Sequence, residues 1–248
     1  METELLLRHF DDLCARADRA GTVTHTAFLT PEEQVLVGDR AKRLRAPVAL
    51  YGGIPDAERR AAFCLPWGMD ETDTAAFEGE IVCVRVDGDV GELTHRDYLG
   101  ALMHLGLERD AVGDILPGKS GYILCLPSAA RLIQNDLLKI GNKNVTLTLC
   151  ATGEVPVPEV RTEQMRFTVK SPRLDAVCAG LFRLSRTEAA ERIKRGDCAV
   201  NHRPTDKPDL TLGEGDTVTL RGLGRGELVS FGGKTKKGRL FVTAERRV

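Results

Sequence analysis

The sequence is poor in aromatic residues and lacks long apolar runs. Aromatic residues make up 5% of the 248 residues, and tryptophan occurs once. No stretch approaches the roughly 20 consecutive apolar residues that a membrane-spanning helix requires, so we expect no membrane span. The first four residues, Met-Glu-Thr-Glu, are acidic, whereas a secretory signal begins with positive charge. Both features favour a cytoplasmic protein.

Paired cysteines are also missing. The seven cysteines stand singly, and an odd number without a C-x-x-C pair argues against a disulfide framework. We expect small buried hydrophobic residues in a reducing compartment. The five histidines are dispersed as well, whereas a metal site needs three or four converging ligands. The sequence therefore predicts neither a metal nor a cofactor.

The near-neutral net charge of −1 conceals an asymmetry along the chain. Residues 161–248 contain 19 Lys and Arg against 11 Asp and Glu, a balance of +8. The other residues keep 16 of the 35 basic and 25 of the 36 acidic side chains, a balance of −9. A basic end on an acidic body suggests that this end meets a polyanion.

The first region, residues 1–74, shows alternating helix and strand signals. Thr30, Pro31 and Glu33 combine an N-cap, a proline at the first helical position and a capping box. Apolar spacing and turn residues predict, in order, a helix over 3–20, a helix over 31–44, a strand over 47–51, a strand over 60–65 and an acidic linker over 70–74.

The second region, residues 75–155, has the order β-α-β-β-α-β. The pattern predicts strands and helices over 80–86, 94–105, 112–115, 122–126, 128–140 and 145–150. This order is that of the ferredoxin-like split βαβ unit. We therefore predict an α+β protein: a small N-terminal α/β region, a central ferredoxin-like (βαββαβ) domain and a third domain over 165–248.

Two motifs in the second region are not interpreted as catalytic. Residues 113–120 fit the phosphate-binding pattern G-x-x-x-x-G-K-S. That chemistry needs a helix after the loop, but a strand pattern follows, so we expect a hairpin turn. His95-Arg96-Asp97 occurs in kinase catalytic loops, yet no other kinase signature accompanies it. Asp97 is better explained as a capping partner of Thr94.

The third region carries the most specific pattern. It predicts short helices over 173–182 and from Ser185 to Gly196, strands over 198–201 and 217–220, and a basic hairpin over 232–239. The order and spacing over about 171–222 closely resemble the alpha-L RNA-binding domain, which is named for small-subunit ribosomal protein S-four. The segments that carry this resemblance are Arg173–Asp175, Ser185–Ala189, Ile193–Gly196, Val200-Asn201, Lys207-Pro208 and Gly215-Asp216.

Further segments resemble the YlmH family of bacterial proteins over almost the whole chain. They are Gly52-Gly53, Ala57–Arg59, His95–Met103, Gly106-Leu107, Gly113–Ile115, Arg221–Arg225 and Lys234–Arg239. The resemblance implies a cytoplasmic, non-catalytic RNA-binding protein. Members of that family are linked to cell-division genes and to stalled large ribosomal subunits that carry peptidyl-tRNA.

The predicted RNA-binding residues are basic or polar side chains of the third region. Arginine suits this role because its planar fork can bind a phosphate through two hydrogen bonds. Aromatic residues are scarce there, which favours folded RNA recognised by shape over stacked single bases. The set is Arg173, Ser185, Arg186, Arg192, Lys194, Asn201, Lys207, Arg225, Lys234, Lys236, Lys237 and Arg239.

The basic third region favours a factor for structured RNA. The resemblance implies that it is non-catalytic and that its main target is ribosomal RNA of the large subunit, with or without peptidyl-tRNA. One alternative is a division-associated adaptor whose main partner is a protein and whose RNA contact is secondary. Another is an RNA-modifying enzyme with a catalytic domain in residues 1–160, which would need a cofactor pocket or converging acid-base groups. The Arg173-Leu174-Asp175 triplet resembles that of pseudouridine synthases, but here it opens a helix of the RNA-binding module, so we do not assign catalysis to Asp175.

Overall fold

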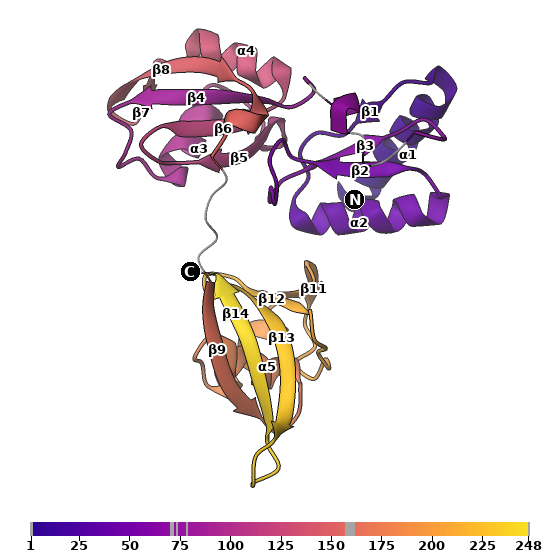
Figure 1. Cartoon of the computed structure of the whole chain (residues 1–248), viewed down its shortest axis with the longest axis vertical. Helices are drawn as coiled ribbons and strands as arrows, with labels where there is room; N and C mark the ends of the chain where they lie inside the picture. Colours follow the sequence, from indigo (N-terminus) through magenta and orange to yellow (C-terminus); the bar gives the residue numbers. More distant parts are fainter. Residues whose placement is uncertain (1, 70–71, 73, 78, 157–161, 248) are drawn as a thin grey trace. The chain divides into compact units, whose positions relative to one another are not determined.

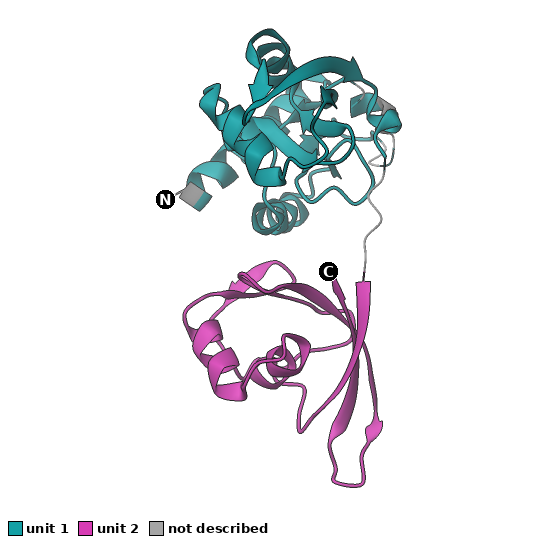
Figure 2. Ribbon diagram, turned by 90° about the vertical axis from the view of Figure 1, so that its left-hand side faces the viewer, with its two compact units in different colours: residues 1–158 teal, residues 159–248 magenta. Residues whose placement is uncertain are grey.

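The chain folds into two compact α+β units, residues 1–158 and 159–248 (Figure 2). The computed structural model describes residues 2–69, 72, 74–77, 79–156 and 162–247 (Figure 1). The predicted boundary between residues 1–74 and 75–155 falls inside the first unit and stays a prediction, as does the start of the third domain at 165. Asp70, Glu71 and Asp73 of the predicted linker lie outside the described residues. None of the described helices has the length and apolar content needed to cross a membrane.

The N-terminal part of the first unit packs two helices against a small sheet. Helices α1 (Glu2–Ala20) and α2 (Pro31–Leu44) accompany strands β1 (Thr24–His25), β2 (Val48–Tyr51) and β3 (Ala61–Cys64), in the order β1-β3-β2. The predicted capping box is confirmed, because the Thr30 hydroxyl accepts from the Glu33 amide and the Glu33 carboxylate accepts from the Thr30 amide. The two-residue strand β1 was not predicted, since it is too short to show a pattern.

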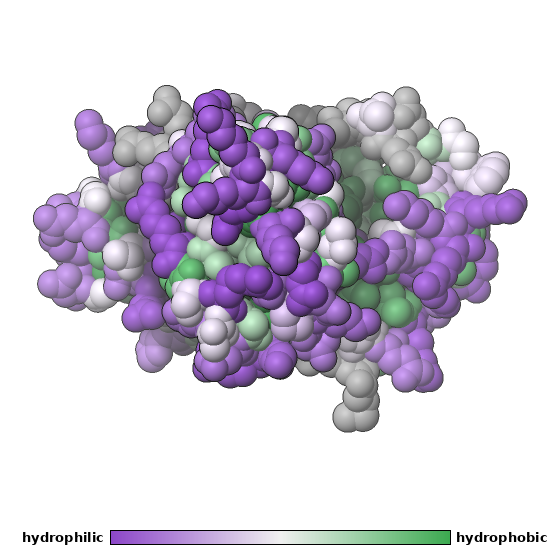
Figure 3. Space-filling model, turned by 90° about the horizontal axis from the view of Figure 1, so that it is seen from below, coloured by the Kyte–Doolittle hydropathy of each residue, from purple (hydrophilic) through white to green (hydrophobic). Residues whose placement is uncertain are grey.

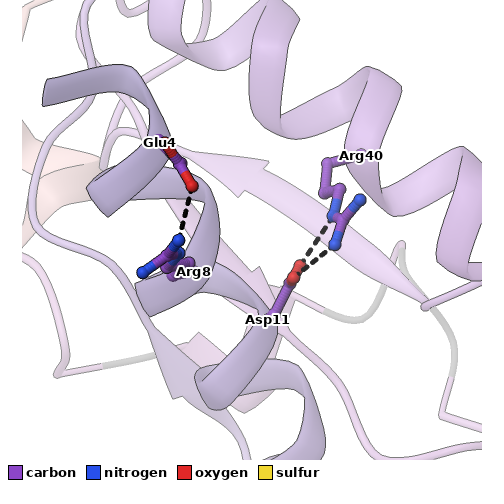
Figure 4. Close-up of polar contacts among 4 residues, drawn as sticks. All are labelled: Glu4, Arg8, Asp11 and Arg40. Atoms are coloured by element: carbon purple, nitrogen blue, oxygen red, sulfur yellow. Dashed lines mark hydrogen bonds and ion pairs between the residues drawn. The ribbon is translucent and has the colours of Figure 1, made fainter. Parts of the chain in front are cut away.

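Helices α1 and α2 are joined by an ion pair. Asp11 on α1 accepts hydrogen bonds from Arg40 on α2, with Nε–Oδ1 at 2.8 Å and Nη2–Oδ2 at 2.5 Å (Figure 4). These bonds hold the pKa of the Asp11 carboxyl below its usual value. Glu4 and Arg8 form a second pair within α1 itself.

The central part has the ferredoxin-like topology that the sequence predicts. The sheet order is β5-β6-β4-β8-β7, and β4 pairs antiparallel with both β6 and β8. The buried cluster that includes Tyr98, Leu102 and Ile133 joins the helices to the sheet. The elements are β4 (Val82–Gly88), α3 (His95–His104), β5 (Val112–Leu116), β6 (Gly121–Cys125), α4 (Pro127–Asp136), β7 (Lys139–Ile140) and β8 (Lys143–Cys150).

The predicted end of the second central helix is wrong. Helix α4 ends at Asp136, and residues 139–140 form the strand β7. The apolar spacing continues past the helix because Leu137 and Ile140 are still buried in the core, although they no longer lie on a helix. The described residues of this unit also form short 3-10 helices at Thr74–Phe77, Arg109–Ala111 and Thr152–Glu154.

Both motifs set aside in the sequence have structural roles. Residues 113–120 belong to the β5–β6 hairpin, in which Leu116 pairs with Tyr122, so the hairpin prediction is confirmed. The Asp97 carboxylate accepts from the backbone amide and hydroxyl of Thr94, each at 2.7 Å, which confirms the predicted cap.

The N-terminal and central sheets share one hydrophobic cluster. Phe28 and Phe63 on one side and Leu124 on the other are buried in it. A Cβ on Gly113 would lie 2.6 Å from the Phe28 ring, so a larger residue would displace this ring. Asp114 accepts hydrogen bonds from the backbone amides of residues 58 and 59, at 2.7 and 2.9 Å. The Gly113-Asp114 pair therefore joins the two halves of the first unit.

The second unit is one antiparallel six-stranded sheet with two short helices on one face. The strand order is β11-β10-β12-β13-β14-β9. Gly180 allows α5 to approach the sheet, since a Cβ there would lie 2.2 Å from the Phe167 ring. The elements are β9 (Thr162–Val169), α5 (Leu174–Leu181), α6 (Arg186–Lys194), β10 (Cys198–Val200), β11 (Arg203–Thr205), β12 (Thr217–Leu220), β13 (Gly224–Lys234) and β14 (Leu240–Arg247).

Candidate nucleic-acid interface

Two predicted arginines are held together by one buried carboxylate. Asp175 is the second residue of α5, where a negative charge is favoured by the helix N-terminus. Its oxygens accept from Arg186 Nη2 at 2.5 Å and from Arg173 Nε at 3.3 Å. The Asp175 side chain is 9% exposed, whereas those of Arg173 and Arg186 are 42% and 57% exposed. We call these three residues the Asp175 cluster.

Asp175 stays charged despite its burial. Desolvation alone would raise the pKa of this carboxyl, but the hydrogen bonds and charges of Arg186 and Arg173 outweigh that effect, and the pKa lies below its usual value. A carboxylate that accepts from two guanidinium groups is a weak base. Its chemistry here is to fix the direction of the two arginines.

A loop brings a third predicted cation to the same helix end. The backbone amides of Leu174 and Asp175 donate to the carbonyls of Leu210 and Pro208, each at 2.9 Å. These bonds hold the loop between β11 and β12 against the start of α5. Lys207 immediately precedes this docked segment, is exposed, and makes no ion pair with any described residue.

The predicted residues of α6 differ in how firmly the fold holds them. Ser185 caps the helix, with its hydroxyl accepting from the Glu188 amide at 3.1 Å. Arg192 Nε lies 3.5 Å from Glu188, and its side chain is 27% exposed. Lys194 is exposed and has no ion-pair partner within the described part of the chain. Lys194 is therefore the freer cation of this helix.

Asn201 has a structural role that the sequence did not show. Its amide nitrogen donates to Asp216 at 2.7 Å and its amide oxygen accepts from the Thr217 amide at 2.9 Å. The residue also has a positive φ of 50° in the turn between β10 and β11. An RNA contact through its remaining amide hydrogen stays a prediction.

The basic hairpin projects from the end of the sheet, as Figure 2 shows for the β13–β14 turn. Arg239 anchors it, because its guanidinium donates to the carbonyl and the hydroxyl of Thr168 on β9, at 2.5 and 3.0 Å. Lys234, Lys236 and Lys237 are exposed and form no ion pair with residues that the structure describes. Hydrophilic side chains cover most of this end of the unit (Figure 3).

The other predicted cation, Arg225, lies on β13 opposite Thr219 and is half-buried. Arg225 therefore lies on a strand of the sheet, whereas the Asp175 cluster forms at the start of α5. Its RNA contact stays a prediction.

Two basic residues outside the predicted set share another carboxylate. Arg195 and Arg221 lie 3.2 and 3.6 Å from the oxygens of Asp197. Arg221 is 81% exposed and follows β12 directly. Both residues lie in basic segments that are visible in the sequence. The sequence does not indicate, however, that two side chains 26 positions apart share one partner.

Among the described residues, no three His, Cys, Asp or Glu side chains converge on a position that could hold a metal ion.

The aromatic rings of the second unit are largely engaged in its core. Phe182 is buried, Phe167 and Phe231 pack partly against the core, and Phe241 is 48% exposed. This unit presents cations and hydrogen-bond donors rather than a platform for stacked bases.

Known proteins match both the sequence and the fold. A family model described as "Putative RNA-binding domain in YlmH" matches residues 73–154. The ribosome-associated protein quality control protein P2 of Bacillus subtilis (strain 168) is 35% identical over 225 residues, which cover 90% of this chain and 86% of the relative. The solved structure of the cell division protein ylmH from Streptococcus pneumoniae aligns with a TM-score of 0.52 and 20% identity, over 62% of this chain and 94% of that chain. At this identity, the structural match shows a shared fold.

Proposed function

The chain belongs to the YlmH family, and from this we propose that it is a non-catalytic RNA-binding factor whose second unit binds structured RNA. The finer target that we propose is ribosomal RNA of the large subunit, with or without peptidyl-tRNA, in ribosome quality control. The name of the Bacillus subtilis relative supports the ribosomal part of this proposal. The RNA-binding description of the family model supports RNA binding by the chain, although the match covers residues 73–154 of the first unit. A ribosomal target implies a cytoplasmic protein.

The observation that carries the proposal is the Asp175 cluster. Two guanidinium groups held by one carboxylate leave a net positive charge, and their orientation is fixed before RNA arrives. Less side-chain entropy is then lost on binding. Each guanidinium still presents nitrogen donors that can bind a phosphate. Lys194 and Lys207 add charge without an ion-pair partner among the described residues.

The order of elements in the second unit also supports RNA binding. Two short helices, a strand and a docked loop follow one another over the segment whose motifs resemble the alpha-L RNA-binding domain. Because the aromatic rings are mostly in the core, we propose recognition of folded RNA through its backbone and shape. The exposed lysines of the hairpin then contact further phosphates.

The test is sedimentation of the tagged full-length protein through sucrose gradients of cell lysate. The variant Arg186→Ala/Lys194→Ala removes one arginine of the Asp175 cluster and the freest cation of α6. We expect the wild-type protein to migrate with ribosomal particles and the variant to shift to the top fractions. Raised salt should weaken the association of the wild type, because phosphate contacts release counterions.

The matched control is Arg166→Ala/Arg247→Ala, which removes two exposed arginines from the sheet face opposite the helices. This variant should migrate as the wild type does. A wild-type protein that stays at the top of the gradient at every salt concentration would refute the ribosomal target. Equal loss in both variants would refute the specific role of the helix face.

A further inference from the structure

The single tryptophan of the chain is exposed beside a pocket in the first unit. Trp67 follows β3 and has 79% of its surface accessible, although an indole ring is normally at least partly buried. The pocket has a volume of about 610 Å³. Its lining includes Ala41, Lys42, Arg45, Val48, Leu50 and Trp67.

Three hydrogen bonds hold the loop that carries Trp67. The Trp67 amide donates to the Asp18 carboxylate of α1 at 3.1 Å. The Leu65 amide donates to the Pro47 carbonyl at 3.0 Å, and the Met69 amide donates to the Pro66 carbonyl at 3.1 Å. The backbone of the tryptophan is therefore fixed before a ligand arrives, which lowers the entropy lost on binding.

Three cations surround the end of α2 that borders this pocket. Lys42, Arg43 and Arg45 make no ion pair with any residue that the structure describes. The Arg45 backbone is fixed in the left-handed region, with its amide bonded to the carbonyls of Ala41 and Lys42. Of these three, Lys42 and Arg45 line the pocket. Their two full positive charges exceed the roughly half negative charge of the helix C-terminus, so this edge of the pocket attracts anions.

We propose that this pocket binds one unpaired nucleotide of an RNA. The base stacks on the indole of Trp67 and lies against the apolar wall of Val48 and Leu50, while Lys42 and Arg45 contact its phosphate. An aromatic face beside cations is the combination that proteins use for unpaired nucleotides. The volume lies in the range of small-ligand pockets. The inference takes its ligand class from the proposed function but concerns a separate site in the other unit.

The tryptophan itself reports occupancy, because no other residue of the protein contributes tryptophan fluorescence. Full-length protein is titrated with a short single-stranded oligoadenylate, and a fluorescein-labelled copy gives affinities by anisotropy. We expect saturable quenching of the Trp67 emission. Trp67→Ala should weaken binding at least about fivefold, since stacking contributes roughly 1–3 kcal/mol per base, and Trp67→Phe should retain most of the affinity.

The charged edge is tested with Lys42→Ala/Arg45→Ala. This variant should bind the oligonucleotide more weakly and with a salt dependence shallower by about 0.7 for each phosphate that is no longer neutralised. The matched control is Arg16→Ala, which removes an exposed arginine of α1 that has no ion-pair partner in the described chain. It should bind as the wild type does. Circular dichroism confirms that each variant is folded.

The outcomes separate this site from the ribosomal proposal. Quenching should persist in Arg186→Ala/Lys194→Ala, whose cations lie in the second unit. If that quenching persists while the wild type fails to sediment with ribosomes, the nucleotide site stands and the ribosomal target falls. Oligonucleotide binding without any change in Trp67 emission, no binding at all, or equal quenching by duplex RNA would each overturn the inference. A protein segment would then become the better occupant of the pocket.

Discussion

At the scale of single residues, the candidate RNA surface depends on Asp175, which does not itself have to touch RNA. Its carboxylate is buried and directs two exposed arginines. The sequence drew attention to this residue through a triplet shared with pseudouridine synthases. In the structure, Asp175 of this triplet instead orients cations, because Arg186 of the next helix donates to its carboxylate and completes the cluster.

We predict that Asp175→Asn weakens binding of a structured ribosomal RNA fragment several-fold. Removal of a negative charge by itself would strengthen attraction to RNA, so a fall in affinity measures how far Arg173 and Arg186 depend on Asp175 for their orientation. Filter binding at fixed salt gives the affinities. Asp209→Asn, at an exposed aspartate, is the control and should not lose affinity. Tighter binding by Asp175→Asn would contradict the orienting role.

The same substitution has a pH signature. The pKa of Asp175 is lowered in the folded state, so its stabilisation is present above the unfolded value of about 4 and is lost as pH falls through the folded value. The free energy of unfolding of Asp175→Asn should therefore lie about 1–3 kcal/mol below that of the wild type near neutral pH. Urea unfolding should show this difference shrinking below pH of about 4. A difference that grows on acidification would contradict the assignment.

At the scale of elements, the β13–β14 hairpin combines an anchor with a set of free charges. Arg239 fixes the turn to β9 through Thr168. The lysines of the turn are exposed and lack ion pairs within the described residues. Their removal should change RNA binding without changing the fold, since surface substitutions of this kind usually alter stability by less than about 0.5 kcal/mol.

We predict that Lys234→Ala/Lys236→Ala/Lys237→Ala lowers the salt dependence of structured RNA binding. The slope of log affinity against log salt should become shallower by about 0.9 for each phosphate that these lysines neutralise in the wild type. Titrations at several salt concentrations measure this slope. The control is Arg166→Ala/Arg247→Ala, and the change in slope is compared per charge removed. An unchanged slope with unchanged affinity would exclude the hairpin from the RNA surface.

At the scale of the whole molecule, the two units have separate cores. The first unit is held together by a hydrophobic cluster shared between its two sheets and by the bonds to Asp114. The second unit buries its own cluster between α5, α6 and the six-stranded sheet. Each unit therefore meets the main requirement for folding alone, a hydrophobic core of its own.

We predict that a fragment of residues 159–248 folds and keeps the structured-RNA affinity of the full chain within about tenfold, a change of about 1.4 kcal/mol. A fragment of residues 1–158 should keep the Trp67 response to oligoadenylate. Thermal melting by circular dichroism and the binding assays described above test both fragments. An unfolded fragment 159–248, or one that binds RNA much more weakly, would show that the second unit needs the first.

The sequence by itself determined the features that arise from neighbours a few residues apart. The cap at Thr30 and Glu33, the cap at Thr94 and Asp97, and the β5–β6 hairpin form within short segments. Because their hydrogen bonds close over a few positions, residue type and spacing suffice to predict them. The ferredoxin-like strand order was likewise predictable, because it follows from the order of the elements.

Tertiary structure alone decided the features whose partners are far apart in the chain. Asn201 in the β10–β11 turn is bound by Asp216 and Thr217 at the start of β12, and Arg239 binds Thr168 over 71 positions. Helix α4 ends at Asp136, although Leu137 and Ile140, which follow it, remain buried in the core. The exposure of Trp67 beside Lys42 and Arg45 likewise depends on how β2 and the loop after β3 lie beside the end of α2. Long-range packing chooses these partners, and no local spacing in the sequence encodes the choice.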